Sequence, residues 1–98
     1  MRNFVLGFQE VGKCYNRTAV TVTVTAQEIS LTSGRKSIAI IPGPDETNEI
    51  YFGGSTVTDA NGAPIGAGKI WNNCKTGFTV WIVCTSGQTA NVRIVEYD

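Results

Sequence analysis

The feature that most constrains the fold is the strict alternation of valine and threonine in residues 19–25. Val20, Val22 and Val24 occupy every second position, and threonines stand between them. Successive side chains of a β-strand point to opposite faces of its sheet, so this spacing predicts a half-buried strand. The composition extends the expectation to the whole chain, because Thr, Val and Ile make up 31 of the 98 residues. Such β-branched side chains favour strands over helices.

Further short apolar or alternating runs between turn residues predict the remaining strands. These runs cover residues 29–31, 37–41, 50–52, 56–58, 77–85 and 89–97. The turn sequence 32–35 predicts a hairpin between the first two of these runs, and the run 77–85 is apolar on both faces, as in a central strand. We expect an all-β fold, a small antiparallel β-sandwich, jelly-roll-like or a Greek-key barrel, with about seven or eight short strands.

The period-two spacing also predicts which side chains share one core. The expected core residues are Val20, Val22, Val24, Ile38, Ile40, Val80, Ile82, Val92 and Ile94. The length fits one domain, so we assign residues 18–98 to a single β-sandwich domain and residues 1–17 to an N-terminal arm or edge strand. Four residues are predicted to be required by turn geometry: Gly53, Gly54, Asn61 and Gly62.

Charge and residue content exclude several functional classes. The chain has eight basic and eight acidic residues and no histidine, so the common general base and every His-bearing triad or zinc site are missing. We therefore expect no enzyme, no cofactor and no metal site. The scattered basic residues predict no nucleic-acid binding, and the longest uncharged stretch, residues 76–92, is too polar for a membrane span.

The three cysteines, Cys14, Cys74 and Cys84, leave two interpretations open. Cys84 continues an apolar alternation and is expected to be buried. Cys14 and Cys74 lie in loop-like sequence, where a bridge between them or to a neighbouring subunit competes with free thiols. Free thiols are favoured for a chain made in reducing cytoplasm.

Several large apolar residues exceed what a thin core needs, and we predict that they form a partner or oligomer interface. Trp81 and Val83 lie on the strand face opposite Ile82, and a two-sheet sandwich does not bury both faces of its strands. The predicted interface residues are Phe4, Leu6, Phe8, Trp71, Trp81, Val83 and Tyr97. The N-terminal apolar residues are expected to dock against a neighbour or a larger assembly.

Four sequence blocks in fixed order support a family resemblance. They are residues 35–40 (RKSIAI), 50–58 (IYFGGSTVT), 61–68 (NGAPIGAG) and 89–96 (TANVRIVE). This pattern resembles small tailed-bacteriophage virion proteins, in which β-sandwich modules serve as capsid decoration or cement proteins and as parts of head fibres, neck appendages and tail fibres. The chain departs from the pattern at residues 71–74 (WNNC) and by extra strands and an arm before Arg35.

The resemblance implies a virion structural protein on the capsid surface, made in the host cytoplasm. As a decoration protein it would bind and stabilise the lattice of the major capsid protein without catalysis. It would do so as a homo-oligomer, with a trimer favoured by the threefold positions of icosahedral shells. The alternative is a head-fibre, neck or tail-fibre module that binds a host surface receptor or another virion protein.

Overall fold

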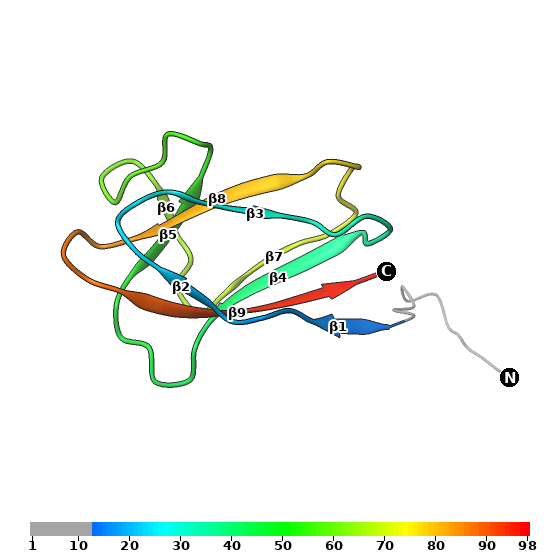
Figure 1. The fold of residues 1–98 in the computed structure, drawn as a ribbon, viewed down its shortest axis with the longest axis horizontal. Helices are drawn as coiled ribbons and strands as arrows, with labels where there is room; N and C mark the ends of the chain where they lie inside the picture. Colours follow the sequence, from blue (N-terminus) through cyan, green and yellow to red (C-terminus); the bar gives the residue numbers. More distant parts are fainter. Residues whose placement is uncertain (1–12) are drawn as a thin grey trace, which may run out of the picture.

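The structure, a computed structural model that describes residues 13–98, is an antiparallel β-sandwich of two sheets (Figure 1). The all-β expectation is confirmed, and the described residues form nine strands rather than seven or eight. The first sheet has the order β1-β9-β4-β7, with β2 also paired to β9. Its strands are β1 (Cys14–Asn16), β2 (Val20–Val22), β4 (Ser37–Pro42), β7 (Lys69–Trp71) and β9 (Ala90–Tyr97).

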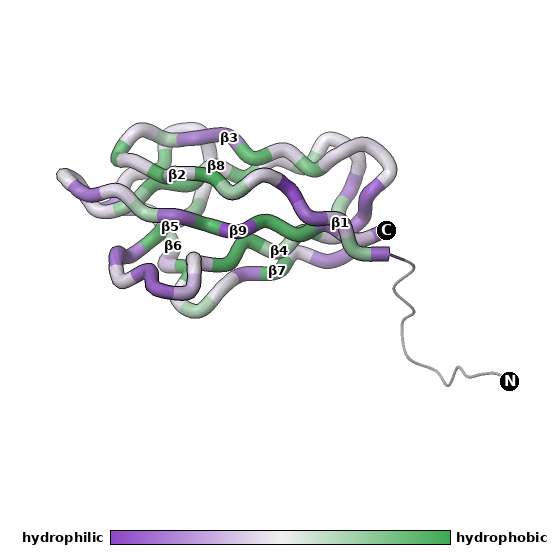
Figure 2. Tube along the Cα trace, turned by 60° about the horizontal axis from the view of Figure 1, so that its bottom comes forward, coloured by the Kyte–Doolittle hydropathy of each residue, from purple (hydrophilic) through white to green (hydrophobic). Residues whose placement is uncertain are grey.

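The second sheet has the order β3-β8-β5-β6. Its strands are β3 (Gln27–Ser30), β5 (Ile50–Gly53), β6 (Ala63–Pro64) and β8 (Thr79–Cys84). The expected central position of the two-faced strand is confirmed, since β8 pairs with both β3 and β5. Figure 2 shows hydrophobic colour along β4, alternating hydrophobic and hydrophilic colour along β9, and hydrophilic colour on much of the edge strands β1 and β3.

The core lies between the sheets and consists mainly of side chains predicted from alternation. Seven of the nine predicted core residues are almost fully buried in one cluster. They are Val22, Ile38, Ile40, Val80, Ile82, Val92 and Ile94. Val20 packs against this cluster while remaining half-buried. The prediction for Val24 is wrong, because β2 ends at Val22 and the Val24 side chain is 48% exposed.

The predicted hairpin between residues 29–31 and 37–41 is also wrong. β3 pairs with β8 in one sheet, whereas β4 pairs with β9 and β7 in the other. The turn at residues 32–35 does form, with the Arg35 amide donating to the Thr32 carbonyl at 3.0 Å. The turn therefore connects strands of different sheets instead of two paired strands of a hairpin. The turn residues are compatible with both arrangements, and only tertiary contacts distinguish them.

Three short segments differ from the expected strands. Residues 56–58 are a turn and loop rather than a strand, although Val57 is buried. β6 and β7 were not predicted, because two- and three-residue strands carry too few positions to show alternation. Within residues 13–98, β7 forms an edge of the first sheet beside β4.

Replacing Ile82 with Asp is expected to unfold the domain. Ile82 has no exposed surface and lies in the centre of the core. An unpaired buried carboxylate costs more than about 3 kcal/mol, which lowers the melting temperature of a domain this size by at least about 15 °C. Thermal unfolding followed by circular dichroism measures this. Val24→Asp, at an exposed valine, serves as the control, and equal melting temperatures for the two variants would contradict the assigned core.

Candidate functional site

The predicted interface residues that lie within residues 13–98, Trp71, Trp81, Val83 and Tyr97, do not come together on one surface. Trp71 lies at the margin of the sandwich, where its ring packs edge-on against Phe52 at 5.1 Å between centroids and beside Phe78 at 5.8 Å. Phe52 and Phe78 come from the second sheet and its approach, so this aromatic group joins the two sheets beside the core. Trp71 is thus half-buried by its own chain, and its contacts are internal.

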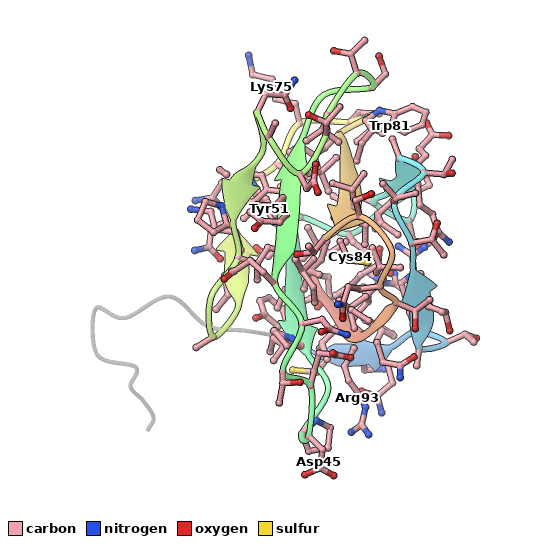
Figure 3. All side chains as sticks on the ribbon, turned by 90° about the vertical axis from the view of Figure 1, so that its left-hand side faces the viewer. Asp45, Tyr51, Lys75, Trp81, Cys84 and Arg93 are labelled. Carbon is pink, nitrogen blue, oxygen red and sulfur yellow. The ribbon has the colours of Figure 1, made fainter. Side chains whose placement is uncertain are left out.

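Trp81 and Val83 lie on the outer face of the second sheet, on the same strand but in different surroundings. Trp81 is half-buried opposite Glu28 of β3, and Figure 3 places it at the upper margin of the molecule. Val83 is completely buried and has no surface to offer a partner. The expectation that a sandwich leaves this face uncovered therefore fails at Val83.

The loop of residues 54–62 lies along the same outer face, beside the neighbour of Val83. Val83 lies opposite Tyr51 in the register, and the Tyr51 Cβ is 2.7 Å from where a Cβ on Gly62 would stand. At the far end of the loop, the Asp59 carboxylate accepts a hydrogen bond of 2.9 Å from the Ser86 amide, just after β8. The loop thus crosses the outer face from β5 to the end of β8.

Two of the predicted turn glycines are required, for reasons of space rather than positive φ. A Cβ on Gly62 would also meet Val57 Cγ2 at 2.8 Å, and one on Gly53 would meet the same atom at 2.9 Å. Gly54 has open space and an ordinary φ, so nothing in its surroundings requires glycine. The Asn61 side chain closes the loop by accepting a hydrogen bond of 2.7 Å from the Thr58 amide.

Tyr97 lies on the opposite side of the molecule from Trp81, on the outer face of the first sheet. It is half-buried between Cys14 and Ser37, its neighbours on β1 and β4. The remaining predicted interface residues, Phe4, Leu6 and Phe8, lie outside the described residues.

An exposed apolar surface does occupy this outer face, and the sequence did not single it out. Asn16, Val95, Ala39 and Ile70 stand in one row across β1, β9, β4 and β7. We call Ala39, Ile41, Ile70 and Val95 the outer strip, in which Ala39 is buried at 2% exposed and Val95 is half-buried. Ile41 and Ile70 are 39% and 50% exposed. They are two of the three exposed large hydrophobic residues among residues 13–98, and the third is Val24.

A groove of about 560 Å³ adjoins the outer strip. It is lined by Asn16, Arg17, Ile41, Pro42, Pro44, Arg93, Ile94 and Val95. The groove lies where β1 and β2 separate along β9, with Arg17 between them. Its walls are mostly apolar, and Arg93 stands at the boundary with a second hollow that contains Asp45 and Glu46 (Figure 3). The two hollows and the strip make this face uneven enough to receive protruding side chains.

A partly buried ion pair lies at the other end of the groove, and its further hydrogen bonds link the two sheets. The Glu96 side chain is 2% exposed and contacts the Arg17 guanidinium at 3.1 Å. The same carboxylate oxygen accepts a hydrogen bond of 2.7 Å from the Thr32 amide, and Arg17 donates at 2.7 Å to the Ser30 carbonyl. Burial by itself would raise the pKa of Glu96, but the hydrogen bonds from Thr32 and the charge of Arg17 lower it overall. Val92, Ile94 and Glu96 occupy every second position of β9. The alternation that predicts Val92 and Ile94 in the core therefore also indicates that the Glu96 side chain points inward.

Burial lowers the reactivity of two of the three cysteine thiols, Cys74 and Cys84. Burial raises the pKa of the Cys84 thiol, which donates to the Gln88 carbonyl at 3.0 Å, and burial also raises the pKa of Cys74. The thiolate is the reactive form, so both changes reduce reactivity. Within residues 13–98, no cluster of three or more acidic, cysteine or histidine side chains is placed to hold a metal ion.

The three cysteines are unpaired. Cys14 and Cys74 lie on opposite sides of the paired strands β9 and β4, since Cys14 faces Tyr97 and the Cys74 amide donates to the Lys36 carbonyl at 2.7 Å. Three strand spacings amount to about 14 Å, which is beyond the reach of a disulfide. The bridge within one chain is therefore excluded in this conformation.

Comparison with known proteins adds no assignment: the chain matches no protein-family model, no curated protein and no solved structure. Residues 13–98 contain no helix long and apolar enough to cross a membrane.

Gly62→Ala is expected to destabilise the domain although the side chain is small. The new Cβ would stand 2.7 Å from Tyr51 Cβ and 3.0 Å from the Thr58 carbonyl, and such overpacking costs about 1–3 kcal/mol. The melting temperature should fall by about 4–20 °C. Gly54→Ala is the matched control and should leave it unchanged. A loss of stability at Gly54 equal to that at Gly62 would contradict the close packing of the loop.

Glu96→Gln is expected to cost about 2 kcal/mol at pH 7, because Arg17 and the Thr32 amide lose a charged acceptor. The pKa of Glu96 is lower in the folded state than the value of about 4.3 for a free side chain. Its stabilisation is therefore complete above that value and disappears as the pH falls through the folded pKa. Urea unfolding of wild type and variant from pH 7 to pH 2.5 should show the difference closing only below about pH 4. The exposed Glu28→Gln is the control, and a pH-independent difference at Glu96 would refute the charge interaction.

Proposed function

We propose that this chain is a bacteriophage virion structural protein, a decoration or cement protein that binds and stabilises the lattice of the major capsid protein without catalysis. The resemblance of the four sequence blocks suggests the virion, and the β-sandwich fold agrees with it. The observation that carries the binding role is the outer strip. Exposed apolar side chains on a sheet face with adjoining grooves are typical of protein interaction sites.

The proposed mechanism is multivalent binding. Ile41 and Ile70 offer a small contact area on each chain, so one copy would bind weakly. A homo-oligomer, with a trimer favoured, would present the same contact several times to a repeating lattice. The second and later contacts then form at a high effective concentration, and many weak interactions produce stable attachment.

The alternative function, a head-fibre, neck or tail-fibre module, is favoured by a different observation. Trp81 is partly exposed on the far side of the molecule from the outer strip. A partly exposed aromatic ring provides a platform for a host glycan or protein. In that case Trp81 would be the functional residue, and the outer strip would only join the module to its neighbours.

Copy number in purified virions distinguishes the two functions. A decoration protein is present in hundreds of copies per virion, and a fibre module in a handful. Quantified gel bands, scaled to the major capsid protein, should show a band of 10.5 kDa at a substantial fraction of the capsid-protein molarity. A ratio of a few copies per virion would favour the fibre, and a chain missing from purified virions would overturn the proposal.

A further inference from the structure

The two sheets differ in how their outer faces are covered. The loop of residues 54–62 packs on the second sheet through Gly62 and Tyr51, and Val83, opposite Tyr51, is completely buried. On the first sheet Ala39 is also buried, at 2% exposed, but Ile41 and Ile70 of the outer strip stay 39% and 50% exposed. Ile41 and Ile70 are therefore exposed large hydrophobic side chains on one sheet face of the described chain, and an apolar segment could cover them.

The size of the strip suits a short extended segment. The row from Asn16 to Ile70 crosses β1, β9, β4 and β7, which is three strand spacings or about 14 Å. An extended run of five residues covers about 17 Å. An occupant of this kind would place two or three apolar side chains over Val95, Ala39 and Ile70.

The chain itself contains such a segment, outside the described residues. Phe4, Leu6 and Phe8 alternate with Val5 and Gly7, so in an extended conformation three large apolar side chains share one face. The twelve residues before Lys13 span up to about 40 Å when extended. That length is sufficient to reach a neighbouring copy.

The entry to β1 decides between the same copy and a neighbour. The Lys13 amide donates to one Asp98 carboxylate oxygen at 3.0 Å, and the Tyr15 hydroxyl contacts the other at 3.2 Å. Asp98 follows the end of β9 and β1 runs antiparallel to β9, so these contacts place Lys13 at the end of the sheet, where β1 begins beside the C-terminus in Figure 1. A segment that arrives from this direction is poorly placed to fold back onto its own strip.

We propose that residues 4–8 of one copy dock on the outer strip of a second copy of this chain. This inference rests on the proposed function, in that it names the occupant of the same surface. The contact is heterologous, because a segment of one copy meets a different surface of the next, and three such contacts can close into a ring. Each copy gives one segment and receives one.

The test mixes two variants that are each defective in half of the contact. Leu6→Asp keeps an intact strip but introduces a charge into the donated segment, and Ile70→Asp keeps the segment but introduces a charge into the strip. Light scattering with size-exclusion chromatography should give wild type about three times the chain mass of 10.5 kDa. Each variant alone should give the mass of one chain, and a one-to-one mixture should recover a species of two chains.

Recovery in the mixture also shows that both variants are folded, because a misfolded chain does not complement. Val24→Asp and Asn3→Asp are controls that add the same charge elsewhere and should behave as wild type. Three results would overturn the proposal: a monomeric wild type at tens of micromolar, Leu6→Asp that still assembles, or two monomeric variants that fail to associate when mixed. These measurements use the purified protein alone, so a monomer that still binds virions would refute segment exchange and leave the proposed function standing.

Discussion

The fold depends on β9, which is the one strand of the first sheet that pairs along both edges for most of its length. On one side it holds β1 and β2, and on the other it holds β4 in a register of six residue pairs. Its inward side chains are Val92 and Ile94 in the core, followed by Glu96. Burial of apolar side chains stabilises most of the strand. At its end the Glu96–Arg17 ion pair takes this role, through hydrogen bonds to Ser30 and to Thr32 in the turn after β3.

The same strand sets what the outer face can do. Since its inward positions are used by the core, Val95 and Tyr97 must face outward, beside Ala39 and Ser37 of β4. On the second sheet, outward-facing apolar side chains lie beside the loop of residues 54–62. This loop packs on Tyr51 through the close approach of Gly62. The first sheet has no equivalent loop among the described residues, so its apolar surface remains available for binding.

The sequence predicted the fold class and most of the core, because alternation along a strand depends only on that strand. It did not predict sheet partners: the turn before Arg35 joins two sheets, which no local pattern reveals. The outer strip was missed for a related reason. Ile41 and Ile70 come from strands far apart in the sequence and become neighbours only through Ala39, whereas Trp81 and Val83 were conspicuous on one strand. Glu96 was predictable in part, since it continues the inward alternation.

The central claim is that this chain acts by assembly through the outer strip and not by chemistry. A cryo-electron microscopy reconstruction of the intact virion tests it most directly, because the position and orientation of the β-sandwich would both be visible. If the chain acts by assembly through the outer strip, we expect the sandwich at regular sites on the capsid surface, with Ile41 and Ile70 buried against another chain. Ile41 and Ile70 facing solvent in the assembled particle, with Trp81 forming the contact instead, would contradict it.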